Sequence, residues 1–344
     1  MTVSNKSNKS NKSNKSNKSN KSNKSDLNNE LAHAGQGTSL LLSDALNSTA
    51  MALNTMALGG IDKDVLQGRA SYRSLNARHL QALLVQALLE GISVDGSDDE
   101  ATIPGIATLK VQRNADFWQR QLKEVYALKW HRDERLSEIY LQQEDIISFL
   151  ALPVHLSMET HPWTIVLLDA IDAATFEVEA QVKRYFSMPR PVDLSPLINP
   201  VIQTPAHSSF PSGHATESFC LARVMAALWG PETANPLRKV AYRIAVNRHY
   251  AGVHFPADSY AGAHLGDALG RAFLLKLGFT GGTPANAVDL DIGGDVSKAT
   301  AVEFEQYSET PMQPLMVAAK RPDGILGWIM DEVAAELPKA GAGQ

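Results

Sequence analysis

The chain has 344 residues, 44% of them hydrophobic, and a formal net charge of -5, values typical of a globular protein with a substantial core. The amino-terminal segment differs in composition, because the triplet Ser-Asn-Lys occurs seven times between Ser4 and Lys24 without an apolar residue. These repeats hold seven lysines and no acid, so the rest of the chain carries -12, which argues against a nucleic-acid-binding protein.

The repeats predict a disordered tail over residues 1–30, followed by a single domain over residues 31–344. A lysine repeat can touch an anionic surface, but a solubilising low-complexity tail is the favoured interpretation. The first 35 residues contain no apolar core of a signal peptide, which predicts a cytoplasmic protein without excluding export. No run of about eighteen uncharged apolar residues occurs, so we expect no integral membrane segment.

Most of the remaining chain shows the three- and four-residue apolar spacing of amphipathic helices, and strand alternation is scarce. The sequence therefore predicts an all-α helical bundle, with its functional core at about residues 130–280. A polar loop, VDGSDDEAT, is expected before Pro104. The last two elements are expected to serve packing or homo-oligomer formation. The expected helices are Leu40–Leu58, Tyr72–Glu90, Asn114–Leu128, Glu134–Ala151, Trp163–Ser187, Ala215–Trp229, Pro236–Tyr250, Pro256–Leu277, Val302–Tyr307 and Gly324–Leu337.

Three short segments contain the candidate anion-binding and catalytic residues. In the first, Lys183 lies at the end of a predicted helix and Arg190-Pro191 follows seven residues later. Both side chains are cationic. A guanidinium binds two oxygens of an oxyanion in a fork, while an ammonium acts as a point charge. This segment predicts part of an anion site.

The second segment, Pro211-Ser212-Gly213-His214, is a turn that leads directly into a helix-compatible run. Ser212 and the Gly213 N–H can donate hydrogen bonds to an anion. A helix amino terminus also favours negative charge, and glycine permits close approach. His214 is then available as a general acid or base.

The third segment places Arg248 six residues before His254, and Asp258 four residues after His254. A neutral histidine can attack phosphorus or ligate vanadium if its other ring nitrogen is held by an orienting group. Asp258 is placed to orient His254, since Pro256 predicts a helix start between them. One such segment alone is usually an ordinary surface feature, but three in order predict an oxyanion site.

The combined pattern KRYFSMPRP, PSGH and RHYAGVHFPAD resembles the superfamily that unites type 2 phosphatidic acid phosphatases, bacterial acid phosphatases and vanadium-dependent haloperoxidases. The resemblance implies that His254 is the phosphorylated or vanadium-bound histidine and that His214 is its acid-base partner. Lys183, Arg190, Ser212, Gly213 and Arg248 would then bind phosphate or vanadate. Asn247 departs from the pattern, which usually has serine before the arginine.

A further histidine bears on the reaction. His207 precedes His214 by seven residues, in HSSFPSGH, and vanadium bromoperoxidases resemble this segment in carrying a second histidine at that offset. The resemblance gives His207 an active-site role and favours a haloperoxidase that oxidises halide with hydrogen peroxide and passes it to an organic acceptor.

Two alternatives stay open. A soluble acid phosphatase would hydrolyse phosphate esters through a phosphohistidine and need no vanadate. A non-enzymatic helical interaction protein is the third, because a motif does not prove turnover.

Overall fold

The computed structural model describes residues 48–49, 71–281, 287–312, 315–317 and 320–337. The Ser-Asn-Lys repeats, and all but two residues of the helix expected over Leu40–Leu58, lie outside these ranges. The helices are α4 (Ala77–Leu89), α5 (Ala115–Leu128), α6 (Leu136–Leu141), α7 (Ile147–Leu150), α8 (Pro162–Lys183), α9 (Pro191–Leu194), α10 (Gly213–Trp229), α11 (Ala234–Tyr250), α12 (Pro256–Lys276), α13 (Ala301–Glu309) and α14 (Gly324–Glu336). The strands are β1 (Asp95–Ser97), β2 (Glu100–Ile103), β3 (Ala107–Val111), β4 (Phe279–Thr280), β5 (Val288–Ile292) and β6 (Met316–Val317).

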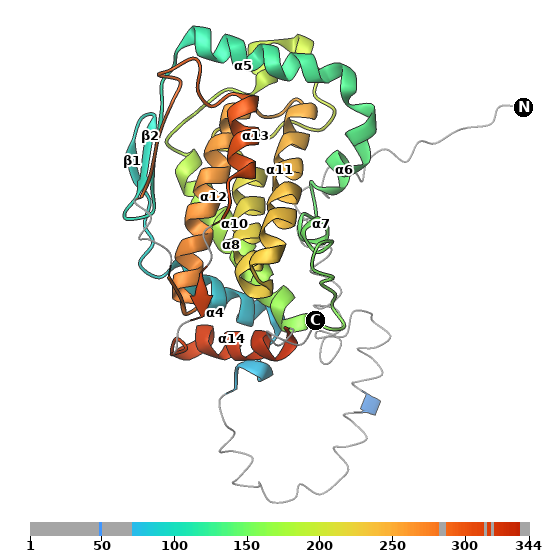
Figure 1. Ribbon diagram of the computed structural model, residues 1–344, viewed down its shortest axis with the longest axis vertical. Helices are drawn as coiled ribbons and strands as arrows, with labels where there is room; N and C mark the ends of the chain where they lie inside the picture. The colour runs from blue at the N-terminus through green and yellow to red at the C-terminus, as the bar shows by residue number, and fades with distance from the viewer. Residues whose placement is uncertain (1–47, 50–70, 282–286, 313–314, 318–319, 338–344) are drawn as a thin grey trace, which may run out of the picture.

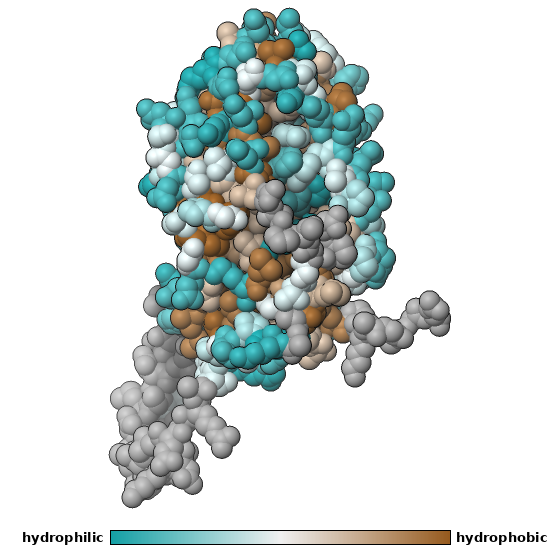
Figure 2. All heavy atoms as spheres, turned by 60° about the vertical axis from the view of Figure 1, so that its left-hand side comes forward, coloured by the Kyte–Doolittle hydropathy of each residue, from teal (hydrophilic) through white to brown (hydrophobic). Residues whose placement is uncertain are grey.

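Helices α8, α10, α11 and α12 run alongside one another and form the centre of the molecule, with α5 across one end and α4 and α14 across the other (Figure 1). The sequence explains where two of them begin, since α8 and α12 each have proline at the first helical position. Among the described helices, none is long and apolar enough to cross a bilayer. The face in Figure 2 is mainly hydrophilic in its upper part, and apolar side chains gather in smaller areas below.

Helices α10 and α12 approach each other through glycines. An added Cβ at Gly262 would lie 2.6 Å from the Ser212 carbonyl oxygen, and one at Gly266 would lie 2.3 Å from the Thr216 carbonyl oxygen. One turn further, a Cβ at Gly270 would again meet a carbonyl of α10, at 2.9 Å. We call these three positions the glycine seam. The seam joins the backbone that carries the Pro-Ser-Gly-His turn to the helix that carries Asp258.

The described residues are predominantly helical, but the expectation of an all-α fold missed two small sheets. Strands β1, β2 and β3 pair antiparallel, and β5 adds parallel to β3. The segment VDGSDDEAT is therefore a β-hairpin and not the predicted polar loop. Buried Ala107, Leu109 and Val111 alternate with half-buried residues along β3, so this sheet packs one face onto the helices.

The predicted helix Glu134–Ala151 is also wrong in its middle. It is divided into a 3₁₀ turn (Asp133–Arg135), α6 and α7, and the residues between α6 and α7 form turns. Gln142 and the following residues enter the central pocket from this break. The other helices described are confirmed with ends shifted by a few residues; for example, α8 ends at Lys183 and not at Ser187.

Candidate active site

The three segments meet at a cavity of about 640 Å³ between α8, α10 and the turns that join α6 to α7. Six of the nine predicted site residues line it, namely Arg190, His207, Gly213, His214, Arg248 and His254. The other three, Lys183, Ser212 and Asp258, are buried behind this lining and hold it in place.

His254 is fixed through both ring nitrogens. Its Nδ1 lies 3.1 Å from Asp258 Oδ2, and its Nε2 lies 3.0 Å from Nη1 of Arg190. A carboxylate accepts and a guanidinium donates, so the proton is on Nδ1 and Nε2 presents its lone pair. Burial, and then the charge of Arg190, lower the pKa of His254 well below its ordinary value. His254 is therefore a neutral histidine in the form that a nucleophile or metal ligand needs.

Asp258 is held by the start of its own helix. Its Oδ2 accepts the main-chain N–H of Phe255 at 2.9 Å, as the third residue of α12 in a capping arrangement. The carboxyl is fully buried, and burial raises its pKa to about 6. The proline at the start of α12 thus places Asp258 where the sequence predicted, beside His254.

Arg190 connects His254 to the loop before α10. Its Nη1 donates to the Val253 carbonyl oxygen at 2.8 Å, and its Nη2 lies 3.2 Å from Nδ1 of His207. His207 is therefore a pocket residue in contact with the cation that contacts His254. Burial, and then Lys183, lower the pKa of His207.

Arg248 is the cation with unused hydrogen-bonding capacity. Its Nη2 donates to the Ile139 carbonyl at 3.0 Å and to Gln142 Oε1 at 3.3 Å, but its Nε and Nη1 have no acceptor among the described residues. The side chain is only 1% exposed, and burial lowers its pKa to about 10, so it stays charged at neutral pH. Buried donors without a partner are rare, and they suit a ligand that brings its own oxygens.

His214 follows Gly213 in the first turn of α10 and is held by the main chain. Its Nε2 donates to the Gln142 carbonyl oxygen at 2.8 Å, which leaves Nδ1 as the atom able to accept a proton. Burial, and then Arg248, lower its pKa to about 3. His214 is therefore neutral over the physiological range.

The Ser212 turn offers further donors, because the Ser212 Oγ is buried without a partner and α10 begins at Gly213. The ammonium of Lys183, which the sequence predicts as an anion ligand, has protein partners in the structure. Its ammonium lies 2.9 Å from Glu179 Oε1 and bonds to the main-chain oxygens of Ser208 and Pro211. Lys183 thus holds the turn that carries Ser212, and its charge acts from behind the pocket.

Sequence reasoning missed Gln142 and the role of Asn247. Asn247 Nδ2 donates to Gln142 Oε1 at 2.9 Å and to Glu138 Oε2 at 2.9 Å, while its Oδ1 accepts from Arg135. The sequence offered one signal for this pair: Asn247 stands where the motif usually has serine, and a buried amide needs hydrogen-bond partners from another element. Its partner Gln142 contacts both Arg248 and His214.

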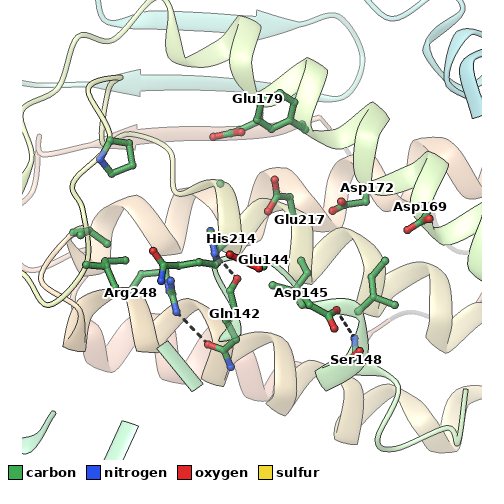
Figure 3. A pocket seen from close by; sticks show the side chains of 18 of the residues that line it. Gln142, Glu144, Asp145, Ser148, Asp169, Asp172, Glu179, His214, Glu217 and Arg248 are labelled. Carbon is green, nitrogen blue, oxygen red and sulfur yellow. Dashed lines mark hydrogen bonds between the residues drawn. The ribbon is translucent and has the colours of Figure 1, made fainter. Parts of the chain in front are cut away.

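One wall of the cavity is acidic (Figure 3). Its carboxylates come from α8, from α10 and from the turns before α7, and they are Glu144, Asp145, Asp169, Asp172, Glu179 and Glu217. Within the described ranges, no group of three or more histidine, cysteine or acidic side chains has the arrangement of a metal site.

Residues 163–279 match the family model of the PAP2 superfamily. No curated protein matches the chain. Among solved structures, the chain is similar to a transmembrane PAP2-type phosphatidylglycerolphosphate phosphatase from Bacillus subtilis, with 16% identity and a TM-score of 0.37 over 60% of this chain and 94% of that chain. It is also similar to a bacterial vanadium-dependent iodoperoxidase, with 18% identity and a TM-score of 0.35 over 46% of this chain and 48% of that chain.

Proposed function

Because residues 163–279 match the PAP2 superfamily, we propose that the chain is an enzyme that binds a tetrahedral oxyanion in this cavity and hydrolyses phosphate esters. The observation that carries the proposal is the pair of buried donors on Arg248, Nε and Nη1, that have no protein acceptor. Arg248 lines the same cavity as His254, whose Nε2 presents its lone pair. A phosphate group would supply the missing acceptors and bring phosphorus to a nucleophile.

In the first step, His254 Nε2 forms a bond to phosphorus as the bond between phosphorus and the leaving oxygen breaks. Arg190 Nη1, which contacts Nε2 at 3.0 Å, turns to the phosphate oxygens. The imidazolium that forms keeps its Nδ1–H directed at Asp258, whose buried carboxylate balances the new charge. Arg248 and the Ser212 turn stabilise the charge on the equatorial oxygens.

His214 is the general acid and base of the proposed reaction. Its pKa of about 3 is set by burial and by Arg248, so a bound phosphate dianion must raise that pKa before His214 can protonate the leaving alcohol. In the second step, the neutral ring takes a proton from water at Nδ1 while the water oxygen bonds to phosphorus and the bond from phosphorus to His254 breaks. The products are the alcohol and inorganic phosphate.

Haloperoxidation is the second candidate, and the contact between His207 and Arg190 favours it. Vanadate fits the same donors, because it is also a tetrahedral oxyanion. His254 would be its protein ligand, and Arg190, Arg248, Ser212 and Gly213 would hold its oxygens. Bound vanadate would supply activation of hydrogen peroxide for halide oxidation.

The acidic side chains of the cavity do not separate the two reactions, because a halide and a phosphate ester are both anions that carboxylates repel. The sequence favours the haloperoxidase through His207, and phosphate and vanadate fit the same donors.

The two reactions are separated by a paired assay on one preparation. We expect hydrolysis of aryl and alkyl phosphates, inhibition by vanadate, and a phosphohistidine at residue 254 found by mass spectrometry after an alkaline quench. His254→Ala should lower turnover by about 10³-fold or more, whereas exposed His131→Ala should not.

The opposite result is bromination of a reporter by the vanadate-loaded protein with peroxide and bromide, without ester hydrolysis. In that case the enzyme is a haloperoxidase, and His207→Ala should lower bromination. If the protein catalyses neither reaction, both candidates are wrong.

A further inference from the structure

Asn247 lies at the centre of a chain of hydrogen bonds that leads from the protein surface to Arg248. Its Nδ2 donates to Glu138 Oε2 at 2.9 Å and to Gln142 Oε1 at 2.9 Å. Its Oδ1 accepts from Arg135 Nη1 at 2.9 Å. Both amide hydrogens and the amide oxygen of this fully buried side chain are therefore in use.

The surface end of the chain is an ion pair between α11 and α6. Arg243 lies one turn before Asn247 on α11 and is exposed. Its Nε donates to Glu138 Oε2 at 2.7 Å, and its Nη2 donates to Glu138 Oε1 at 2.6 Å. The hydrogen bonds from Arg243 lower the pKa of Glu138, so this carboxyl group is ionised at neutral pH. Glu138 therefore presents only hydrogen-bond acceptors to Asn247.

The two charged neighbours of Asn247 determine how both buried amides are turned. Glu138 only accepts and Arg135 only donates, so Asn247 directs Nδ2 at the carboxylate and Oδ1 at the guanidinium. The second hydrogen on Nδ2 needs an acceptor, and Gln142 therefore directs Oε1 at it. The same Oε1 accepts from Arg248 Nη2 at 3.3 Å. A carboxylate on the far side of Asn247 thus sets which end of the Gln142 amide faces Arg248.

This orientation matters for the direction of the Arg248 guanidinium. Its Nη2 is held by Gln142 Oε1 and by the Ile139 carbonyl oxygen at 3.0 Å, while its Nε and Nη1 have no acceptor among the described residues. A guanidinium is planar, so fixing Nη2 also fixes the directions in which Nε and Nη1 donate. If Gln142 presented its Nε2 instead, two donors would face each other and Arg248 would lose this support.

We infer that Glu138 and Asn247 are positioning residues of the oxyanion site and act on Arg248 through Gln142. The inference rests on the oxyanion binding proposed above. Neither Glu138 nor Asn247 lines the cavity, so their effect on a ligand is indirect. The serine that the motif usually has at this position carries one hydroxyl hydrogen and could donate to only one of the two acceptors. Asparagine serves both.

The first test is Asn247→Ser, which introduces no charge and keeps at most one of the two donor contacts. Binding of inorganic phosphate is measured by titration calorimetry on the full chain, and ester hydrolysis by steady-state kinetics. We expect the phosphate Kd and the KM to rise about 5- to 10-fold, since one hydrogen bond in the chain is lost. The kcat should change less than about twofold, because His214 and His254 keep their partners.

The second test separates amide orientation from folding. Asn247→Asp places a carboxylate against Glu138 and should lower the melting temperature through repulsion between like charges. Adding Glu138→Gln restores one carboxylate and one amide in exchanged order, so most of the melting temperature should return. The exchanged carboxylate cannot donate to Gln142, and the phosphate Kd should therefore stay about fivefold or more above that of the wild type. The uncharged Asn247→Ser variant excludes the relocated charge as the only cause.

The matched control is Glu134→Gln, which removes an exposed carboxylate from the turn just before α6. It should leave the phosphate Kd and the KM unchanged. Two results would contradict the inference while leaving the hydrolase proposal intact. One is an unchanged phosphate Kd in Asn247→Ser. The other is a double variant, Glu138→Gln with Asn247→Asp, in which both the melting temperature and the phosphate Kd return to wild-type values, which would mean that the pair only supports the fold.

Failure of the proposed function gives a different result. If the folded wild-type protein binds phosphate but hydrolyses no ester, the hydrolase proposal is wrong, and the same titrations still test the two positioning residues. If it binds neither phosphate nor vanadate, both the hydrolase proposal and this inference are wrong.

Discussion

Gln142 allows anion binding to be separated from proton transfer by one substitution. Its side-chain Oε1 accepts from Asn247 at 2.9 Å and from Arg248 at 3.3 Å, whereas its main-chain oxygen holds His214 at 2.8 Å. Gln142→Ala removes the first two contacts and keeps the third. A hydrogen bond to a neutral amide contributes about 1 kcal/mol and one to a charged group about 1.5 to 3 kcal/mol, so the loss is about 3 kcal/mol.

Part of this loss should appear in ligand binding. Arg248 is 1% exposed, so water cannot easily replace the missing acceptor, and its guanidinium is left with only the Ile139 carbonyl. We expect a lower melting temperature, a smaller stabilisation by inorganic phosphate, and a kcat/KM reduced about 10- to 100-fold mainly through KM. The pH profile should keep its shape, because the contact that sets the proton position on His214 is retained.

Thermal unfolding with and without phosphate, and steady-state kinetics over pH, measure these effects. Gln119→Ala is the control, since it makes the same change at an exposed position of α5. Unchanged stability and KM in Gln142→Ala would show that Gln142 does not hold Arg248. A shifted pH profile would show that its side chain also determines the protonation of His214.

The glycine seam and the buried histidines give two further predictions. Gly266→Ala should lower the free energy of unfolding, measured in urea, by about 2 kcal/mol. The added Cβ would lie 2.3 Å from the Thr216 carbonyl oxygen, and this overpacking outweighs the gain in helix propensity. An unchanged or more stable variant would refute the close contact. Stability should also fall below pH 6.5, the ordinary histidine pKa, because His214 and His249 stay neutral in the folded chain down to about pH 3 and take up protons on unfolding. The pKa of Asp258 is raised to about 6, so Asp258 takes up a proton in the folded chain and offsets the effect of one histidine. A free energy of unfolding that stays constant from about pH 7 to 5 would contradict the burial of the two histidines.

The long helices could be predicted from sequence because their signals are local. In α8, the apolar spacing and the first-turn proline agree with the burial that the structure shows. The same holds for the pairing of His254 with Asp258, since a proline-initiated helix places residues four apart within reach of each other.

Other features depend on contacts between distant residues and could not be read locally. The VDGSDDEAT hairpin is held by pairing with β3, which in turn pairs with β5 almost two hundred residues away. The predicted helix Glu134–Ala151 has good helical periodicity, yet its break at Gln142 is bonded to α11 and α10. Periodicity cannot reveal that two polar groups of one residue have partners elsewhere.

The glycine seam also limits how the site can vary and how it can be transferred. Because α10 and α12 touch through backbone atoms, the spacing between Ser212 and Asp258 is independent of the size of the core side chains. The Ser212 N–H bonds directly to the Asp258 carbonyl oxygen at 2.9 Å, which closes the same contact at its active-site end. The two helices therefore form one structural unit. Transferring this site to another scaffold would require both helices together, with their glycines.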